Sequence, residues 1–246
     1  MLTALGFGAL ASCALVLGSL VGIKWSPSHR FTGVLLAFAS GTLIAALAFE
    51  LFPMAVESGG LTRSTLGLIT GAAVFVIFNT WLDKKVAPVT AAGDKAEETE
   101  VIREGASRGL GFALLASVTL DGVPENLALG ASLQLHASLT LLVAIFASNF
   151  PEALVGAIAM RKGGQSGKAI FFIWTGAAAI LTLTVVIGSL AKGLEGNTLA
   201  FVLSFAGGAV LASLADTLMP EAFERGRPLN SFATALGFVL SFSLAF

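Results

Sequence analysis

Long runs of apolar residues, separated by short polar segments, extend along the whole chain. A helix of roughly 20 residues spans a hydrocarbon core of ~30 Å, and the runs have this length or more. They predict an all-α polytopic membrane protein with one transmembrane domain over residues 1–246. The eight predicted transmembrane helices are residues 2–23, 31–56, 62–82, 108–135, 137–160, 168–191, 197–222 and 229–246. The composition agrees, because 56% of the residues are hydrophobic, 12% are charged and the mean hydropathy is +0.89.

The basic residues predict how the helices are oriented. With the N-terminus outside, every Lys and Arg except Arg63 and Lys192 falls on the inner side of the membrane. Under the positive-inside rule, this bias predicts that both termini lie on the outer side of the cell membrane, that is, the inner or plasma membrane. The one long connection, residues 83–107, carries mixed charges and almost no apolar side chains. We expect a flexible cytoplasmic loop there.

An internal repeat relates two of the helices. Residues 38–59 align without gaps to residues 205–226, with identities that include Gly41/Gly208, Pro53/Pro220 and Glu57/Glu224. The two segments lie in the second and the seventh predicted helices, an odd offset of five, so they cross the membrane in opposite directions. Inverted repeats of this kind are typical of secondary transporters, whose substrate site lies near the bilayer midplane. The pattern predicts a 3+2+3 plan, with helices 1–3 and 6–8 arranged around helices 4 and 5.

Carboxylates in helices 4 and 5 are the candidate site. Asp121 and Glu125 are one helical turn apart, and Glu152 follows Pro151 in the next helix. Intramembrane carboxylates are costly and usually mark an ion path, and the prolines would free backbone carbonyls near them. With Ser148 and Asn149, these groups predict an oxygen-rich site for one divalent cation. Outside it, Glu50 and Asp216 lie deep in helices 2 and 7 and are candidates for an entry or exit path.

The motifs Asp121-Gly-Val-Pro-Glu125-Asn and Ser148-Asn-Phe-Pro-Glu152-Ala resemble those of the ZIP (Zrt/Irt-like) family of divalent metal transporters. The usual patterns there are His-Asn-x-Pro-Glu-Gly and His-x-x-Pro-Glu-Gly. The chain therefore resembles a divergent, prokaryotic-type member. The resemblance implies uptake of metal into the cytosol by alternating access, and it is compatible with a homodimer. The resemblance also implies that Glu125 and Glu152 are metal ligands.

Several family ligands are replaced in this sequence. Asp121 stands where the family has a metal-binding histidine, and Ser148 replaces the histidine of helix 5. Asn149 replaces a residue that is often acidic, and Gly122 replaces an asparagine. Predicted helix 6 has no carboxylate between its flanking lysines, so a single-metal site is expected.

The donor set bears on which metal is carried. The chain has two histidines, His29 and His136, and both fall in predicted loops, where we expect solvated side chains rather than ligands. An all-oxygen site suits Mn²⁺ or Fe²⁺ better than a histidine site does, whereas zinc is the family's usual cargo and generally binds more tightly. Zn²⁺, Mn²⁺, Fe²⁺ and Cd²⁺ are thus the candidate substrates, and no cofactor is expected.

Two other classes of protein remain open at this point. The altered ligands are compatible with a non-transporting relative that acts as a metal sensor or scaffold. An intramembrane enzyme with Asp121 and Asp216 as an aspartyl pair is disfavoured, because the Gly-x-Gly-Asp signature is missing. No nucleotide-binding loop is present, and the net charge of −1 does not suggest a nucleic-acid partner. The expected partners are divalent cations and the lipid bilayer.

Overall fold

The computed structural model describes residues 1–95, 118–191 and 196–246, which are helical with no strand in these ranges. The helices are α1 (Leu2–Lys24), α2 (His29–Ala46), the π-helical turn η1 (Leu47–Leu51), α3 (Phe52–Lys95), a helix over residues 118–132, α5 (Leu139–Lys162), α6 (Gly167–Ser189), α7 (Gly196–Ser213), the π-helical turn η2 (Leu214–Leu218), α8 (Met219–Gly226) and α9 (Asn230–Ala245). The predicted all-α class is confirmed.

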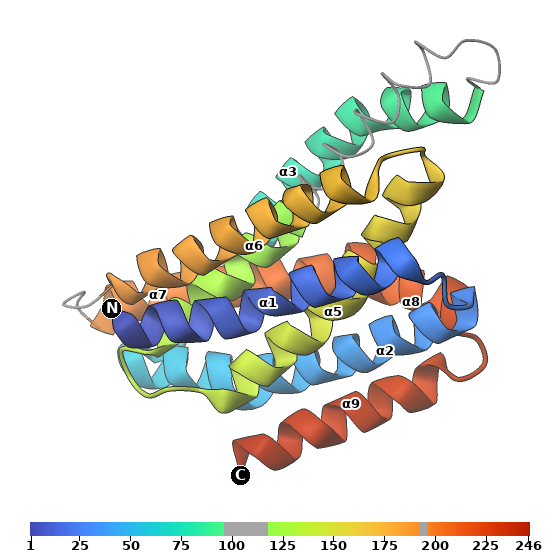
Figure 1. The fold of residues 1–246 in the computed structure, drawn as a ribbon. Helices are drawn as coiled ribbons and strands as arrows, with labels where there is room; N and C mark the ends of the chain where they lie inside the picture. Colours follow the sequence, from blue (N-terminus) through green and yellow to red (C-terminus); the bar gives the residue numbers. More distant parts are fainter. Residues whose placement is uncertain (96–117, 192–195) are drawn as a thin grey trace.

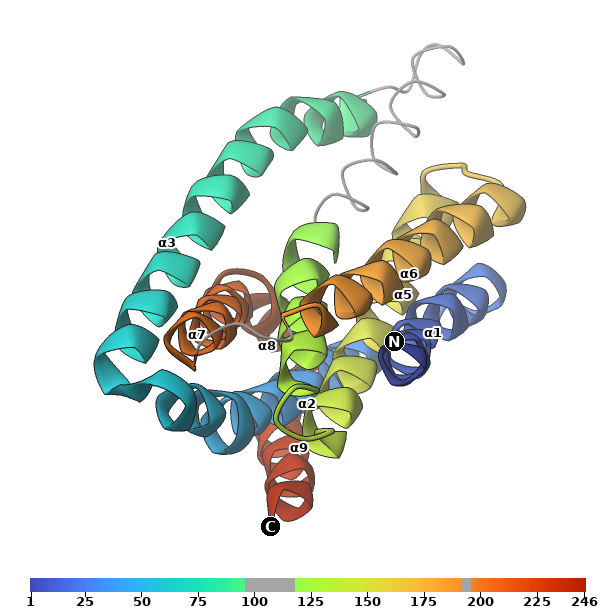
Figure 2. The same cartoon turned by 90° about the vertical axis from the view of Figure 1, so that its left-hand side faces the viewer.

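Five helical segments of the described chain are long and apolar enough to cross a membrane: Leu2–Lys24, His29–Leu82, Leu139–Lys162, Gly167–Ser189 and Gly196–Gly226. The second of these covers two of the predicted spans. Its backbone leaves helical geometry at Gly59 and Gly60, where Gly60 has a φ of 80° that glycine adopts without strain. This break falls between the predicted spans 31–56 and 62–82, and α3 changes direction there (Figure 2). Helix α9 is apolar but shorter.

The segment 83–107 is described only in part. Helix α3 continues to Lys95, inside the segment predicted as a loop. Residues 96–107 lie outside the described residues.

The helices pack in pairs that follow the repeat. Helix α2 lies along α9, and α3 lies along α7, while α1 packs on α5 and α6 (Figure 1). Glycines permit the first two pairings. A Cβ on Gly41 of α2 would overlap the carbonyl oxygen of Thr234 in α9, and one on Gly208 of α7 would overlap that of Leu68 in α3. Gly41 and Gly208 are equivalent positions of the repeat, so the same close approach is built twice.

The repeat also has a shared backbone irregularity. The π-helical turns η1 and η2 occupy equivalent positions, each ending two residues before the shared proline, Pro53 or Pro220. The two residues that follow the turns have the same φ and ψ, −69° and −41°. A proline lacks an N–H and crowds the carbonyl four residues before it, and a widened turn relieves that crowding. In Figure 1, α2 and α7 run in opposite directions, as the inverted repeat predicts.

Candidate metal site

The helix over residues 118–132 and α5 carry the predicted ligands. Glu125 is buried, with 6% of its surface exposed, and Ser148 and Asn149 are fully buried. Asp121 and Glu152 are half-buried. The Ser148 hydroxyl lies 3.0 Å from the carbonyl oxygen of Ile145 and 3.3 Å from Oε2 of Glu125. The structure therefore joins the two proline-containing helices through a Ser148–Glu125 contact.

Asp121 has a partner that the sequence did not indicate. The hydroxyl of Ser213, at the end of α7, donates a hydrogen bond of 2.8 Å to Oδ1 of Asp121. Thr217, in the adjoining turn η2, lies 3.3 Å from the same Ser213 hydroxyl. Asp121 is thus linked to the irregular turn of the second repeat, although 92 residues separate it from Ser213. No local motif signals a pairing over that distance.

The three carboxylates act on one another electrostatically. Glu125 experiences the charge of Asp121, and Glu152 experiences those of Glu125, Asp121 and Glu221. Within the described residues, no Lys or Arg forms an ion pair with Asp121, Glu125 or Glu152. Buried like charges without a cationic partner are unfavourable, because desolvation and mutual repulsion add together. A bound cation or a proton must therefore compensate the charge.

Two buried amides provide further oxygen atoms. Asn149 donates from Nδ2 to the carbonyl oxygen of Ala11 in α1 at 3.1 Å, and Asn126 donates to that of Gly122 at 2.8 Å. The Oδ1 atom of each accepts no hydrogen bond from the described residues. A buried acceptor without a donor is costly and can be satisfied by a water or a cation. Asn126 directly follows Glu125 and is not among the ligands predicted from the sequence.

The geometry also sets a limit. Among the described residues, no three His, Cys, Asp or Glu side chains converge closely enough to form a ready-made metal site. Any cation held here would therefore combine carboxylates with hydroxyl, amide or backbone oxygens. Ser148 supplies one such neutral oxygen, 3.3 Å from Oε2 of Glu125, and mixed sets of this kind suit hard or borderline divalent ions.

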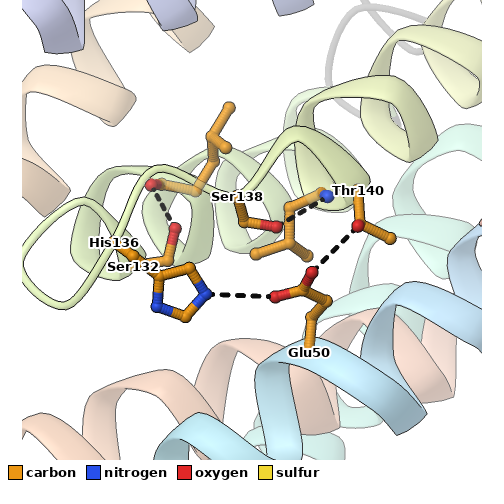
Figure 3. A network of polar contacts seen from close by, with 7 residues as sticks. Glu50, Ser132, His136, Ser138 and Thr140 are labelled. Atoms are coloured by element: carbon orange, nitrogen blue, oxygen red, sulfur yellow. Dashed lines mark hydrogen bonds and ion pairs between the residues drawn. The ribbon is translucent and has the colours of Figure 1, made fainter. Parts of the chain in front are cut away.

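Among the described residues, neither predicted path residue is hydrogen-bonded to the carboxylates of this cluster. Glu50, in η1, accepts a 2.8 Å hydrogen bond from Thr140 and has Oε2 3.4 Å from Nε2 of His136 (Figure 3). His136 is in the connection before α5, as predicted, but it contacts a carboxylate rather than only solvent. Asp216, in η2, is exposed.

Comparison with known proteins gives relatives at low identity. No protein-family model matches the chain. The chain is 32% identical over 141 residues to the zinc transporter ZIP11 of Homo sapiens, a match that spans 53% of this chain and 41% of the human protein. It thus covers less than half the length of that relative.

The bacterial relatives match over most of their length. The zinc transporter ZupT of Salmonella heidelberg is 24% identical over 237 residues, which are 91% of this chain and 88% of that protein. A ZupT of Salmonella paratyphi A is 24% identical over 228 residues, or 87% and 84%. These likenesses agree with the resemblance to the ZIP family that the sequence motifs show. The relatives are named as transporters rather than enzymes, and the apolar helices fit an integral membrane protein.

Proposed function

We propose that this protein is a secondary transporter that carries divalent transition-metal cations across the cytoplasmic membrane, into the cytosol. The observation that carries the proposal is the group of Asp121, Glu125 and Glu152, which repel one another without a Lys or Arg partner among the described residues. The similarity to zinc transporters supports a metal ion as the compensating charge.

The residues around Glu125 would complete the coordination. Glu125 experiences the charge of Asp121, acts in turn on Glu152 and contacts Ser148, so it is the proposed central ligand. The free Oδ1 of Asn149 and the carbonyls released by Pro124 and Pro151 would add neutral oxygens. Such a donor set accepts Mn²⁺ and Fe²⁺, whereas the intrinsic order of affinities favours Zn²⁺. We propose Zn²⁺ as cargo, together with Mn²⁺ or Fe²⁺.

The proposed transport cycle uses the inverted repeat. We infer eight crossings in a 3+2+3 plan, which the break at Gly59–Gly60 and the matching turns η1 and η2 support. Alternating access would then arise as the two repeats move around the helices that carry the carboxylates. The basic residues support both termini outside, and the two termini lie at the same end of the bundle (Figure 1).

The test is metal flux into proteoliposomes that contain the purified full chain. Zn²⁺, Mn²⁺, Fe²⁺ and Cd²⁺ are compared, in the wild type and in the double variant Glu125→Ala/Glu152→Ala. A matched control is Glu57→Ala/Glu224→Ala, which removes two exposed carboxylates at equivalent positions of the repeat. We expect flux in the wild type and the control and none in the site variant.

Two results would contradict the proposal. Flux that persists in Glu125→Ala/Glu152→Ala would place the transported ion elsewhere. Absence of flux for every ion, with the protein folded by circular dichroism, would favour a metal sensor or scaffold. Strict zinc selectivity would leave transport intact but would contradict the inclusion of Mn²⁺ and Fe²⁺.

A further inference from the structure

Two potential metal ligands meet away from the buried carboxylates, where η1 faces the connection before α5. Nε2 of His136 lies 3.4 Å from Oε2 of Glu50, and 86 residues separate the two along the chain. Thr140, in the first turn of α5, donates to the other oxygen of Glu50, Oε1, at 2.8 Å. Figure 3 shows the imidazole and the carboxylate facing each other, with Thr140 on the far side of the carboxylate.

Hydrogen bonds hold the connection that carries His136 at both of its ends. The backbone N–H of His136 donates to the carbonyl oxygen of Ser132 at 3.1 Å, which extends the preceding helix by a turn. The side-chain amide of Gln134 donates to the carbonyl oxygen of Ser189, at the end of α6, at 2.6 Å. Ser138 caps the start of α5. The imidazole is therefore presented from a braced turn rather than from a loose loop.

The two side chains of the pair differ in their exposure to solvent. The His136 side chain is 57% exposed, whereas that of Glu50 is only 12% exposed. Thr140 fixes the carboxylate plane and leaves Oε2 directed at the imidazole, which is how a neighbouring donor commonly orients a carboxylate ligand. An ion that arrives from solvent would meet His136 first and the recessed Glu50 second.

The separation of the two atoms matches a metal-bridged pair. Zinc binds histidine nitrogen at about 2.0–2.1 Å and carboxylate oxygen at about 2.0–2.2 Å with tetrahedral angles, so two such ligands lie roughly 3.3–3.5 Å apart. The observed 3.4 Å falls in this range. It is longer than the roughly 2.7–2.9 Å of a charge-assisted hydrogen bond between a cationic nitrogen and a carboxylate.

We infer that Glu50 and His136 form a second divalent-cation site, in which water fills the remaining coordination positions. The connection before α5, which carries His136, lies at the end of the bundle where the two termini lie (Figure 1). It has one nitrogen and one oxygen donor, so it favours Zn²⁺ over Mn²⁺ and Mg²⁺. Two protein ligands make a weak, rapidly exchanging site, which suits the capture of ions from solvent. The inference does not depend on the proposed function of the buried carboxylates.

The presence of only two histidines makes the site directly observable. Full-length protein with ¹⁵N-labelled histidine has two imidazole spin systems, and His29→Gln assigns them by removing one. On titration with Zn²⁺, we expect the nitrogen signals of His136 to shift and saturate while those of His29 remain in place. The Glu50→Gln variant should need at least tenfold more Zn²⁺ for the same shift. Mn²⁺ and Mg²⁺ should compete poorly.

The background Glu125→Ala/Glu152→Ala separates this site from the buried one. The His136 shift should persist there, even if flux is lost or was never present. A His136 signal that does not respond to Zn²⁺, or that responds equally in Glu50→Gln, would overturn the inference and leave an ordinary ion pair or a lone surface histidine. If Glu50→Gln fails to fold, His136→Gln, at an exposed position, should lower the zinc stoichiometry by one.

Discussion

The turns η1 and η2 have the same backbone but different chemistry. In each turn, the backbone N–H of the residue that follows the turn donates a hydrogen bond to the carbonyl oxygen five residues earlier. The donor and acceptor are Phe52 and Leu47 in η1, and Met219 and Leu214 in η2. The side chains differ, because Glu50 in the first repeat corresponds to Thr217 in the second. Glu50 contacts His136 in the connection before α5, whereas Thr217 contacts Ser213, whose hydroxyl donates to Asp121.

The two halves share backbone features and differ in their polar side chains. Both halves contain the glycine at which a neighbouring helix packs closely and the proline that follows the widened π-helical turn. Glu50, inside the first turn, contacts His136, and Ser213, directly before the second turn, donates to Asp121. The two halves thus share a backbone, while the polar side chains in and beside their turns contact different parts of the central segment.

The largest expected effect concerns the close-packing glycines that both halves share. Gly41→Ala and Gly208→Ala each place a Cβ against a backbone carbonyl that cannot move alone, so each should lower stability by about 1–3 kcal/mol through overpacking. Thermal unfolding in detergent would measure this. The control is Gly176→Ala in α6, where a Cβ meets nothing within 4 Å. If one glycine variant were as stable as the control, the two halves would not share this contact.

The sequence predicted the features that the two halves share better than the side-chain contacts in which they differ. Hydrophobic runs predicted the all-α class, and the alignment of residues 38–59 with 205–226 predicted two related segments. The π-helical turns inside these segments were not predicted, although the shared proline that follows each of them is visible in the sequence. The sequence also placed Glu125 and Ser148 in one site. It did not connect Ser213 with Asp121 or His136 with Glu50, because only packing sets those contacts. The loop over residues 83–107 stays a prediction, since α3 is described to Lys95 and residues 96–107 lie outside the described residues.

A smaller effect is expected from Ser213, the residue of the second repeat that is hydrogen-bonded to Asp121. Ser213→Ala removes the 2.8 Å hydrogen bond to Oδ1 of Asp121, which we expect to orient the carboxylate toward the metal. A lost hydrogen bond of this kind is worth about 1 kcal/mol, or roughly a fivefold weaker Kd for Zn²⁺. Calorimetric titration of the buried site in a His136→Gln background would measure it.

Ser241→Ala in α9 is the matched control for that substitution. Ser241 is also a buried serine, but its hydroxyl has no hydrogen-bond partner among the described residues. Its zinc affinity should equal that of the background. An unchanged Kd in Ser213→Ala would mean that Ser213 only packs against Asp121 and that the second turn contributes no chemistry to the site.

The smallest effect should come from Thr140→Val, on the side of the first repeat. Valine keeps the shape of threonine but cannot donate to Oε1 of Glu50, so the carboxylate loses one of the contacts that fix its plane. Because Glu50 is partly exposed, water replaces the lost donor, and we expect a cost of about 0.5 kcal/mol, or a two- to threefold weaker response of the His136 imidazole to Zn²⁺. Thr65→Val, which removes a hydroxyl bonded only within its own helix, is the control. A Thr140→Val response equal to this control would show that His136 and Glu50 hold their geometry without Thr140, whereas a loss as large as that of Glu50→Gln would make Thr140 a ligand in its own right.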